Sequence, residues 1–154
     1  EELYIHRPAV NWSNKLTLTL DSIPSGLRKL RLSGDWKEQV DTLFGDNGAT
    51  LKLNEHLPHL EILDIEDTIL TNDSWMVHSP QSLTKVNLDQ WNGDVELPSS
   101  LIDFEAANVY LSTNSFVSKL PPSLENFVVS NCLRGVELIL PLLPPCVVVG
   151  SNSY

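Results

Sequence analysis

One phrase of apolar and polar residues recurs along the chain. It consists of a proline, a gap of one or two residues, and then Leu-x-x-apolar-x-apolar followed by polar residues. A clear copy is Pro24-Ser-Gly-Leu27-Arg-Lys-Leu30-Arg-Leu32, and the phrase occurs six times, the last time in the degenerate form Pro144-Pro-Cys-Val147-Val-Val149. The first apolar residue of each copy, called the anchor below, is Leu27, Leu60, Leu83, Leu101, Leu124 or Val147.

The spacing of the anchors and the alternation after them predict a parallel sheet. Successive anchors lie 33, 23, 18, 23 and 23 residues apart, and a recurring interval of this length indicates stacked repeats. The fourth and sixth positions of a copy are apolar while the fifth and seventh are polar or variable, which is the pattern of a strand with one buried face. A 23-residue repeat leaves room for a return segment, so the five or six strands are expected to be parallel.

The segments between the strands are expected to be short or irregular. The longest interval predicts one helix at about 36–44, with an acidic start at Asp35 and a stop at Gly45. A second, less regular helix is expected within 50–56. The remaining segments are rich in proline and serine, which favours extended or 3₁₀ turns. Ahead of the first copy, residues 15–20 alternate and predict a strand.

The phrase resembles the repeat of the leucine-rich-repeat superfamily, as in Leu124-Glu-Asn-Phe-Val-Val-Ser-Asn131-Cys132, over residues 23–150. The proline ahead of the anchor, in Leu97-Pro98-Ser-Ser-Leu101, is similar to a Pro-containing subtype in bacterial effector proteins and in yeast and amoebal F-box-like repeat proteins. The resemblance implies an irregular α/β solenoid with a parallel sheet on its concave face and mostly short or non-helical convex segments.

The resemblance also implies how the chain is organised. We expect a single domain over residues 1–154, with 1–22 as an N-terminal cap or atypical repeat and 23–150 as five to six repeats, within a larger protein. The asparagine that usually follows the strand is present in two copies and replaced in three. The residues at this position are Gly34, Asp67, Gln90, Asn108 and Asn131.

The side chains between the buried strand positions are expected to form a binding surface on the concave face. The candidate partner-binding residues are Lys29, Arg31, Asp64, Glu66, Lys85, Asn87, Asp89, Trp91, Asp103 and Glu105. Five of them form an acidic belt: Asp64, Glu66, Asp89, Asp103 and Glu105. The belt predicts a protein partner with a basic surface, although charges on an exposed sheet also serve solubility alone.

Composition narrows the classes of partner. The 154-residue chain carries 20 acidic and 10 basic residues and a formal net charge of −10, which disfavours nucleic acid and anionic membranes. The longest apolar stretch, 136–149, is interrupted by Glu137 and three prolines, so no membrane-spanning segment is expected. Two cysteines favour a reducing compartment such as the cytoplasm, whereas the glycosylation sequons at Asn11 and Asn72 favour secretion. The compartment is left open.

No catalytic, metal or cofactor site is expected from the residue pattern. His56 and His59 are separated by a proline and lack the i, i+4 spacing of a helical metal pair. Cys132 and Cys146 occupy apolar repeat positions without a neighbour that would activate a thiol. No nucleophile elbow or phosphate-binding glycine loop occurs.

The sequence therefore predicts a non-enzymatic protein–protein interaction module, the recognition arm of a larger protein. The resemblance adds substrate recognition for a ubiquitin ligase as one setting. A secreted or cell-surface ligand-recognition domain is the alternative, and a carbohydrate-active β-solenoid enzyme is a remote one. The alternative fold is an irregular all-β sandwich, which requires antiparallel strand pairing.

Overall fold

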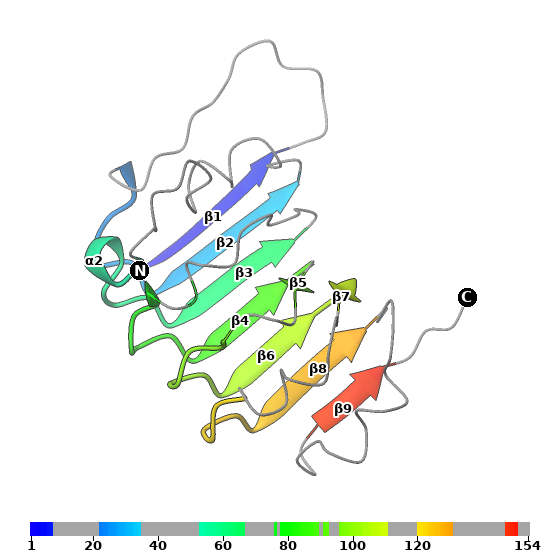
Figure 1. Cartoon of the computed structure of the whole chain (residues 1–154). Coiled ribbons are helices and arrows are strands. Elements are labelled where there is room, and N and C mark those ends of the chain that lie inside the picture. Colours follow the sequence, from blue (N-terminus) through cyan, green and yellow to red (C-terminus); the bar gives the residue numbers. More distant parts are fainter. Residues whose placement is uncertain are drawn as a thin grey trace.

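The computed structural model describes residues 1–7, 22–34, 53–66, 76, 78–89, 91–92, 96–110, 120–130 and 147–150. Within them, seven strands form one sheet in the order β1-β2-β3-β4-β6-β8-β9 (Figure 1). The strands are β1 Glu2–Arg7, β2 Lys29–Gly34, β3 Ile62–Glu66, β4 Lys85–Leu88, β6 Asp103–Ala106, β8 Asn126–Ser130 and β9 Val147–Gly150. Every pair of neighbours is parallel. The parallel sheet is confirmed, and the antiparallel sandwich is wrong.

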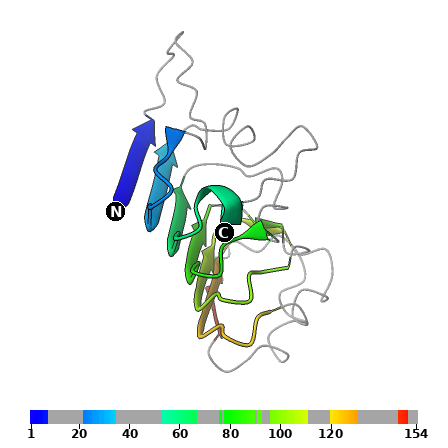
Figure 2. The ribbon, with the colours of Figure 1, turned by 90° about the vertical axis from the view of Figure 1, so that its left-hand side faces the viewer.

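Few other elements accompany the sheet. Strands β5 (Trp91–Asn92) and β7 (Val109–Tyr110) form a separate two-stranded sheet, and α2 (Leu53–His56) is the one α-helix in the described part of the chain. Figure 2 shows α2 and these two strands on the same side of the large sheet. The helix predicted within 50–56 is thus present as a single turn, ended by Pro58. The helix predicted at 36–44 and the strand at 15–20 lie outside the described residues.

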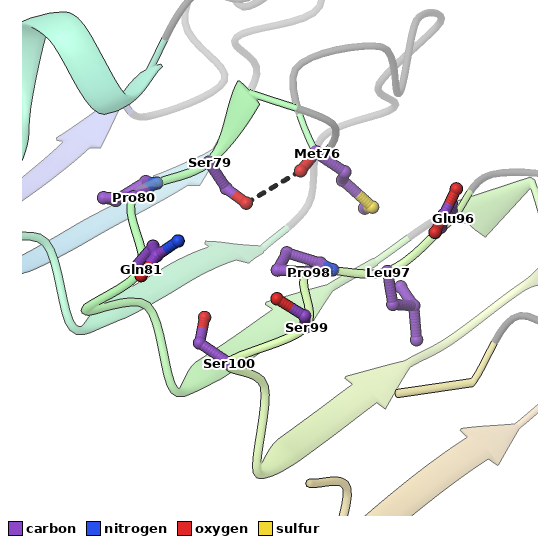
Figure 3. A pocket seen from close by; sticks show the side chains of 9 residues that line it. All are labelled: Met76, Ser79, Pro80, Gln81, Glu96, Leu97, Pro98, Ser99 and Ser100. Atoms are coloured by element: carbon purple, nitrogen blue, oxygen red, sulfur yellow. Dashed lines mark hydrogen bonds between the residues drawn. The ribbon is translucent and has the colours of Figure 1, made fainter. Parts of the chain in front are cut away.

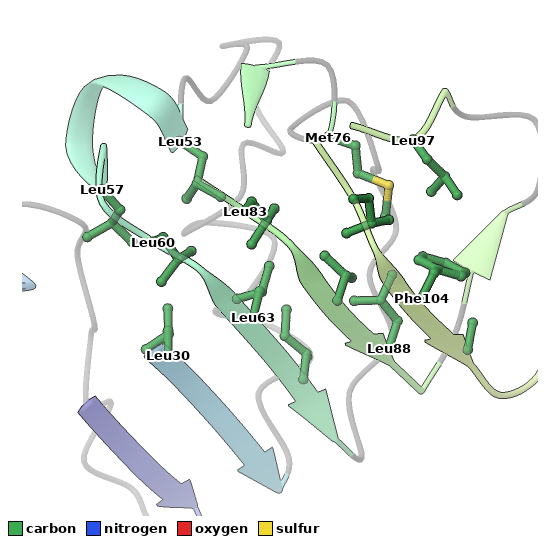
Figure 4. Packing of buried hydrophobic residues seen from close by; sticks show 14 of the residues in the cluster. Leu30, Leu53, Leu57, Leu60, Leu63, Met76, Leu83, Leu88, Leu97 and Phe104 are labelled. Atoms are coloured by element: carbon green, nitrogen blue, oxygen red, sulfur yellow. The ribbon is translucent and has the colours of Figure 1, made fainter. Parts of the chain in front are cut away.

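The core forms where the alternation predicts it. At the fourth and sixth positions of the five regular copies the side chains are at most 3% exposed. The ten residues are Leu30 and Leu32, Leu63 and Ile65, Val86 and Leu88, Phe104 and Ala106, and Phe127 and Val129. Leu53 of α2 joins them, and Figure 4 shows the buried leucines gathered on the helix side of the strands. The rings of Phe104 and Phe127 stack at 5.5 Å between centroids.

A tight turn precedes each of the five regular strands. The anchor N–H donates to the carbonyl three residues earlier, as in Leu83 to Pro80 at 3.0 Å and Leu101 to Pro98 at 3.1 Å. Where the gap after proline is one residue shorter, the Leu57 carbonyl accepts from Leu60 instead. Proline suits such a turn because it restricts the backbone and its carbonyl remains available as an acceptor.

Serines just before three anchors connect successive copies. The Oγ of Ser82 donates to the Leu60 carbonyl at 2.8 Å. Ser100 and Ser123 donate in the same way to the preceding anchors, Leu83 and Leu101, both at 2.7 Å. Each serine therefore satisfies a carbonyl of the copy before it, which accounts for Pro-x-Ser-Leu in these three copies.

Both ends of the sheet correct the sequence-based interpretation. Strand β1 was not predicted, yet it pairs with β2 over six residues and places Leu3 opposite Leu30. At the other end, β9 is the edge strand that the degenerate last copy indicated, but its register is different. Val147 lies opposite Phe127 rather than Leu124, so it occupies the fourth position of its copy and is not an anchor. A run of three valines carries no alternation, which is why the pattern alone placed it wrongly.

Candidate functional site

Parallel pairing aligns the outward side chains into rows across the strands, about 4.8 Å apart from strand to strand. We call the surface formed by these rows the polar face; it lies opposite the core. The first row holds Glu2, Lys29, Ile62, Lys85, Asp103 and Asn126. The second row holds Tyr4, Arg31, Asp64, Asn87, Glu105 and Val128, and the third begins with His6, Ser33 and Glu66.

The structure brings most of the expected site residues together. Eight of the ten candidates lie in these rows: Lys29, Arg31, Asp64, Glu66, Lys85, Asn87, Asp103 and Glu105. Asp89 directly follows β4, and its N–H donates to the Ile65 carbonyl at 3.1 Å. Trp91 is separated from the set, because the chain leaves the large sheet after Asp89 and Trp91 pairs with Val109 in the two-stranded sheet.

Arg31 forms ion pairs with two carboxylates of the acidic belt. Its Nε lies 2.6 Å from Asp64 Oδ2, and its terminal nitrogen donates to Glu66 Oε1 at 3.0 Å. The buried Nε makes no well-directed hydrogen bond, so its contact with Asp64 is chiefly electrostatic. The negative charge of Asp64, and then that of Glu66, raises the pKa of the Arg31 guanidinium above its ordinary value.

Asp64 is the least accessible carboxylate of the belt. Its exposed fraction is 8%, and it also accepts a hydrogen bond of 3.0 Å from Asn87 Nδ2. A charge that is buried to this extent requires a partner of opposite charge and further hydrogen bonds. Asp64 therefore connects β3 to its neighbouring strands rather than adding to the accessible charge of the face. The five carboxylates of the belt thus differ in accessibility.

The accessible negative charge lies on the later strands. Glu105 is exposed and has no side-chain partner among the described residues, while Asp103 accepts a hydrogen bond from the uncharged amide of Asn126. A hollow of about 130 Å³ opens beside Glu105. Its lining is Ile65, Glu66, Asn87, Leu88, Asp89, Glu105, Ala107 and Ser130.

Sequence reasoning missed the two outward side chains of β1 beside Arg31. The centroid of the Tyr4 ring lies 5.9 Å from the Arg31 guanidinium carbon, which is a cation–π contact. The Tyr4 hydroxyl and His6 Nδ1 both hydrogen-bond to Ser33 Oγ, at 3.1 and 2.8 Å. Because Ser33 is only 3% exposed, this network is suited to holding β1 against β2. The alternation of Leu3-Tyr-Ile5-His was the available signal, but no phrase precedes it.

The asparagine that follows the strand has a conformational role in the described copies. Gly34 and Asn108 both have positive φ, 95° and 50°, which glycine and asparagine tolerate better than other residues. The Asn108 amide also donates to the Asp89 carbonyl at 3.1 Å. In these two copies the position therefore holds a residue that tolerates positive φ at the end of the strand.

A second hollow, of about 260 Å³, lies between the turn ahead of β4 and the turn ahead of β6 (Figure 3). Its lining is Met76, Ser79, Pro80, Gln81, Glu96, Leu97, Pro98, Ser99 and Ser100. The Ser79 hydroxyl donates to the Met76 carbonyl at 2.7 Å. Glu96 is the one ionisable residue of this lining, and no base lies beside a serine there.

Other candidate chemistry is limited in the described part of the chain. No group of three or more His, Cys, Asp or Glu side chains is placed to hold a metal ion in the ranges that the structure describes, which include His56 and His59. No helix of those ranges is long and apolar enough to cross a membrane. Asn11, Asn72 and both cysteines lie outside the described residues.

Comparisons of this chain with protein-family models, with curated proteins and with solved structures found no match. The function of the polar face therefore has to follow from its own geometry and charge.

Proposed function

We propose that the chain is a leucine-rich-repeat domain whose polar face binds another protein. The fold part of this proposal is supported by the recurring phrase together with the pairing of consecutive copies in parallel. The turn ahead of each regular strand and the serine contacts between copies recur at equivalent positions. Stacked repeats of this kind present an extended surface, which is suited to binding a macromolecule.

The observation that carries the binding proposal is the uneven charge of the polar face. On β2 and β3 the carboxylates of Asp64 and Glu66 both form an ion pair with Arg31. On β6, Asp103 and Glu105 make no ion pair with a described residue, although Lys85 lies next to Asp103 in the first row. A partner with a basic surface would gain most at β6 and β8, where charge complementarity raises the association rate and sets the orientation of the complex.

The domain acts in this proposal as the recognition arm of a larger protein, with no chemistry of its own. The carboxylates of the later strands are accessible to water, whereas acid–base catalysis by a carboxylate needs an enclosed site that shifts its pKa. Ser33, the serine bonded to a histidine, is buried and also bonded to Tyr4. Substrate recognition for a ubiquitin ligase is the setting that the resemblance implies.

The test compares three versions of the domain as baits in affinity capture from cells that produce the protein. The first is wild type, the second carries Asp103→Lys and Glu105→Lys, and the third carries Glu96→Lys. Glu96 is exposed and lies ahead of the turn before β6 rather than on the sheet. We expect a protein retained by wild type and by Glu96→Lys and lost from the double variant.

The captured protein is then purified and its dissociation constant measured by calorimetry for the three versions. A loss of affinity of about 10-fold or more in the double variant alone supports the proposal. Replacing an attractive pair of charges by a repulsive pair should weaken binding by roughly 1.4 kcal/mol, which corresponds to a 10-fold increase in the dissociation constant. Equal affinities would place the binding surface elsewhere.

A further inference from the structure

The hollow beside Glu105 lies on the polar face, near the ends of the strands. Its volume is about 130 Å³, and its lining comes from β3, β4, β6 and β8 and from the residues that directly follow β4 and β6. These four strands are consecutive neighbours in the sheet (Figure 1). A protein cavity of roughly 150 Å³ holds a benzene molecule, so this hollow has room for a planar group of a few heavy atoms.

Two short side chains leave the space for this hollow. Backbone hydrogen bonds continue one residue past β4 and β6, so the third row of the polar face runs from Glu66 through Asp89 and Ala107 to Ser130. Ala107 carries only a methyl group and Ser130 only a hydroxymethyl group, and both residues are partly buried. Space therefore remains above them, beside the longer side chains of Glu66 and Glu105.

The charge around the hollow is negative. Among the described residues of its lining, three are carboxylates, Glu66, Asp89 and Glu105, and none is a cation. Glu66 on β3 and Glu105 on β6 are two strand spacings apart, which is roughly 10 Å across the sheet. Asp89 follows β4, the strand between them. A positive group that extends over several ångströms would therefore meet carboxylates on both sides of the hollow.

The same face already holds a guanidinium against two carboxylates. The Arg31 Nε lies 2.6 Å from the second-row carboxylate of Asp64, and its terminal nitrogen donates to the third-row carboxylate of Glu66 at 3.0 Å. A guanidinium can do this because it is planar and carries five N–H donors that point to several sides. The hollow offers a similar set farther along the sheet, with Glu105 in the second row and Asp89 in the third.

We propose that the hollow receives an arginine side chain of the protein partner, with its guanidinium paired to the Glu105 carboxylate and directed toward Glu66 and Asp89. This inference rests on the proposed function and names the group by which the partner is anchored. Arginine fits better than lysine, because an ammonium is a compact charge that cannot reach carboxylates on opposite sides of the hollow at once. No three acidic or histidine side chains in the described ranges are placed to hold a metal ion, which favours an extended organic cation as the occupant.

The first experiment needs no partner. A blocked Gly-Arg-Gly peptide is titrated into the isotope-labelled domain, and the backbone amide shifts are followed by NMR, with blocked Gly-Lys-Gly as the comparison. We expect saturable shifts at Glu105, Ala107 and Ser130 with a dissociation constant of about 1–10 mM. The lysine peptide should bind at least about 5-fold more weakly. Absence of saturable shifts, equal binding of both peptides, or shifts spread evenly over the acidic residues would overturn the proposal.

Two substitutions separate the shape of the hollow from its charge. Ala107→Leu keeps the net charge and fills the space, so it should abolish saturable binding of the arginine peptide, whereas Ala107→Ser should weaken binding much less. Glu105→Gln keeps the shape and removes the paired carboxylate, and it should weaken binding about 5-fold, as expected for an accessible ion pair. Glu96→Gln removes the same charge outside the polar face and is the control. Circular dichroism verifies that each variant is folded.

The outcomes of these substitutions decide the proposal. Loss of binding in Ala107→Leu and weaker binding in Glu105→Gln support an arginine seated in the hollow. Binding that survives Ala107→Leu would mean that the peptide lies elsewhere on the face. An effect of Glu96→Gln equal to that of Glu105→Gln would mean that only the net charge of the domain attracts the peptide, and either result would overturn the proposal.

The second experiment uses the captured partner and separates this inference from the proposed function. Ala107→Leu should raise the partner's dissociation constant about 10-fold or more, because it excludes the anchoring side chain. If Ala107→Leu keeps wild-type affinity while Asp103→Lys with Glu105→Lys loses it, the polar face binds its partner without an arginine in the hollow, and only this inference fails. If both keep wild-type affinity, the proposed function fails as well.

Discussion

Arg31 on β2 lies with its Nε 2.6 Å from Asp64 Oδ2 on β3, and the two residues are direct neighbours in the sheet register. The contact joins a partly exposed cation to a carboxylate that is 8% exposed. Together with the Arg31–Glu66 contact, it leaves the carboxylates of β3 ion-paired, whereas those of β6 make no ion pair with a described residue.

Arg31→Met should lower the free energy of unfolding because it leaves the Asp64 carboxylate buried without a cation. The measurement is urea unfolding followed by circular dichroism. Adding Asp64→Asn to Arg31→Met should recover part of the loss, since the remaining amide carries no charge and can still accept from Asn87. If the double variant is less stable than Arg31→Met, Asp64 does not depend on Arg31.

Phe127→Ala should destabilise the domain by about 3–5 kcal/mol, because it removes a fully buried ring that stacks on Phe104. The adjacent residue, Val128, lies on the polar face and is partly exposed, so Val128→Ala should cost less than about 1 kcal/mol. Thermal unfolding of the two variants distinguishes the faces. Similar losses in both would contradict the assignment of core and polar face.

Ser123→Ala should cost about 1 kcal/mol, because the Oγ of Ser123 donates to the Leu101 carbonyl of the preceding copy and approaches that of Ser99 at 2.8 Å. Ser99 is exposed, and Ser99→Ala is the matched control with an expected change within about 0.5 kcal/mol. Chemical denaturation at a fixed temperature measures both. Equal stability of the two variants would mean that the serine contact between copies contributes nothing.

Much of the sheet could be predicted from the sequence because the signal is local. The apolar residues at the fourth and sixth positions predicted β2, β3, β4, β6 and β8 and the residues that they bury. Alternation along one strand reports which side chains share a face, whatever strand lies beside it. For the same reason eight of the ten candidate residues were assigned to one surface.

The tertiary structure decided which of those residues are accessible. Arg31 meets Asp64 and Glu66 only because β2 and β3 pair in a register that joins positions 33 and 35 residues apart. Trp91 left the set because its strand pairs with β7 instead of the large sheet.

At both ends of the sheet, the register of the strand was decided by its pairing with the neighbouring strand. Strand β1 has alternation but no phrase, and β9 has three valines without alternation, so neither register was encoded locally. The amino-acid sequence by itself determined the five regular strands, their buried side and the acidic excess of the polar face, since these follow from residue type and period. Only the tertiary structure decided which charges form ion pairs and in which register the end strands pair, because those depend on contacts between residues far apart in the chain.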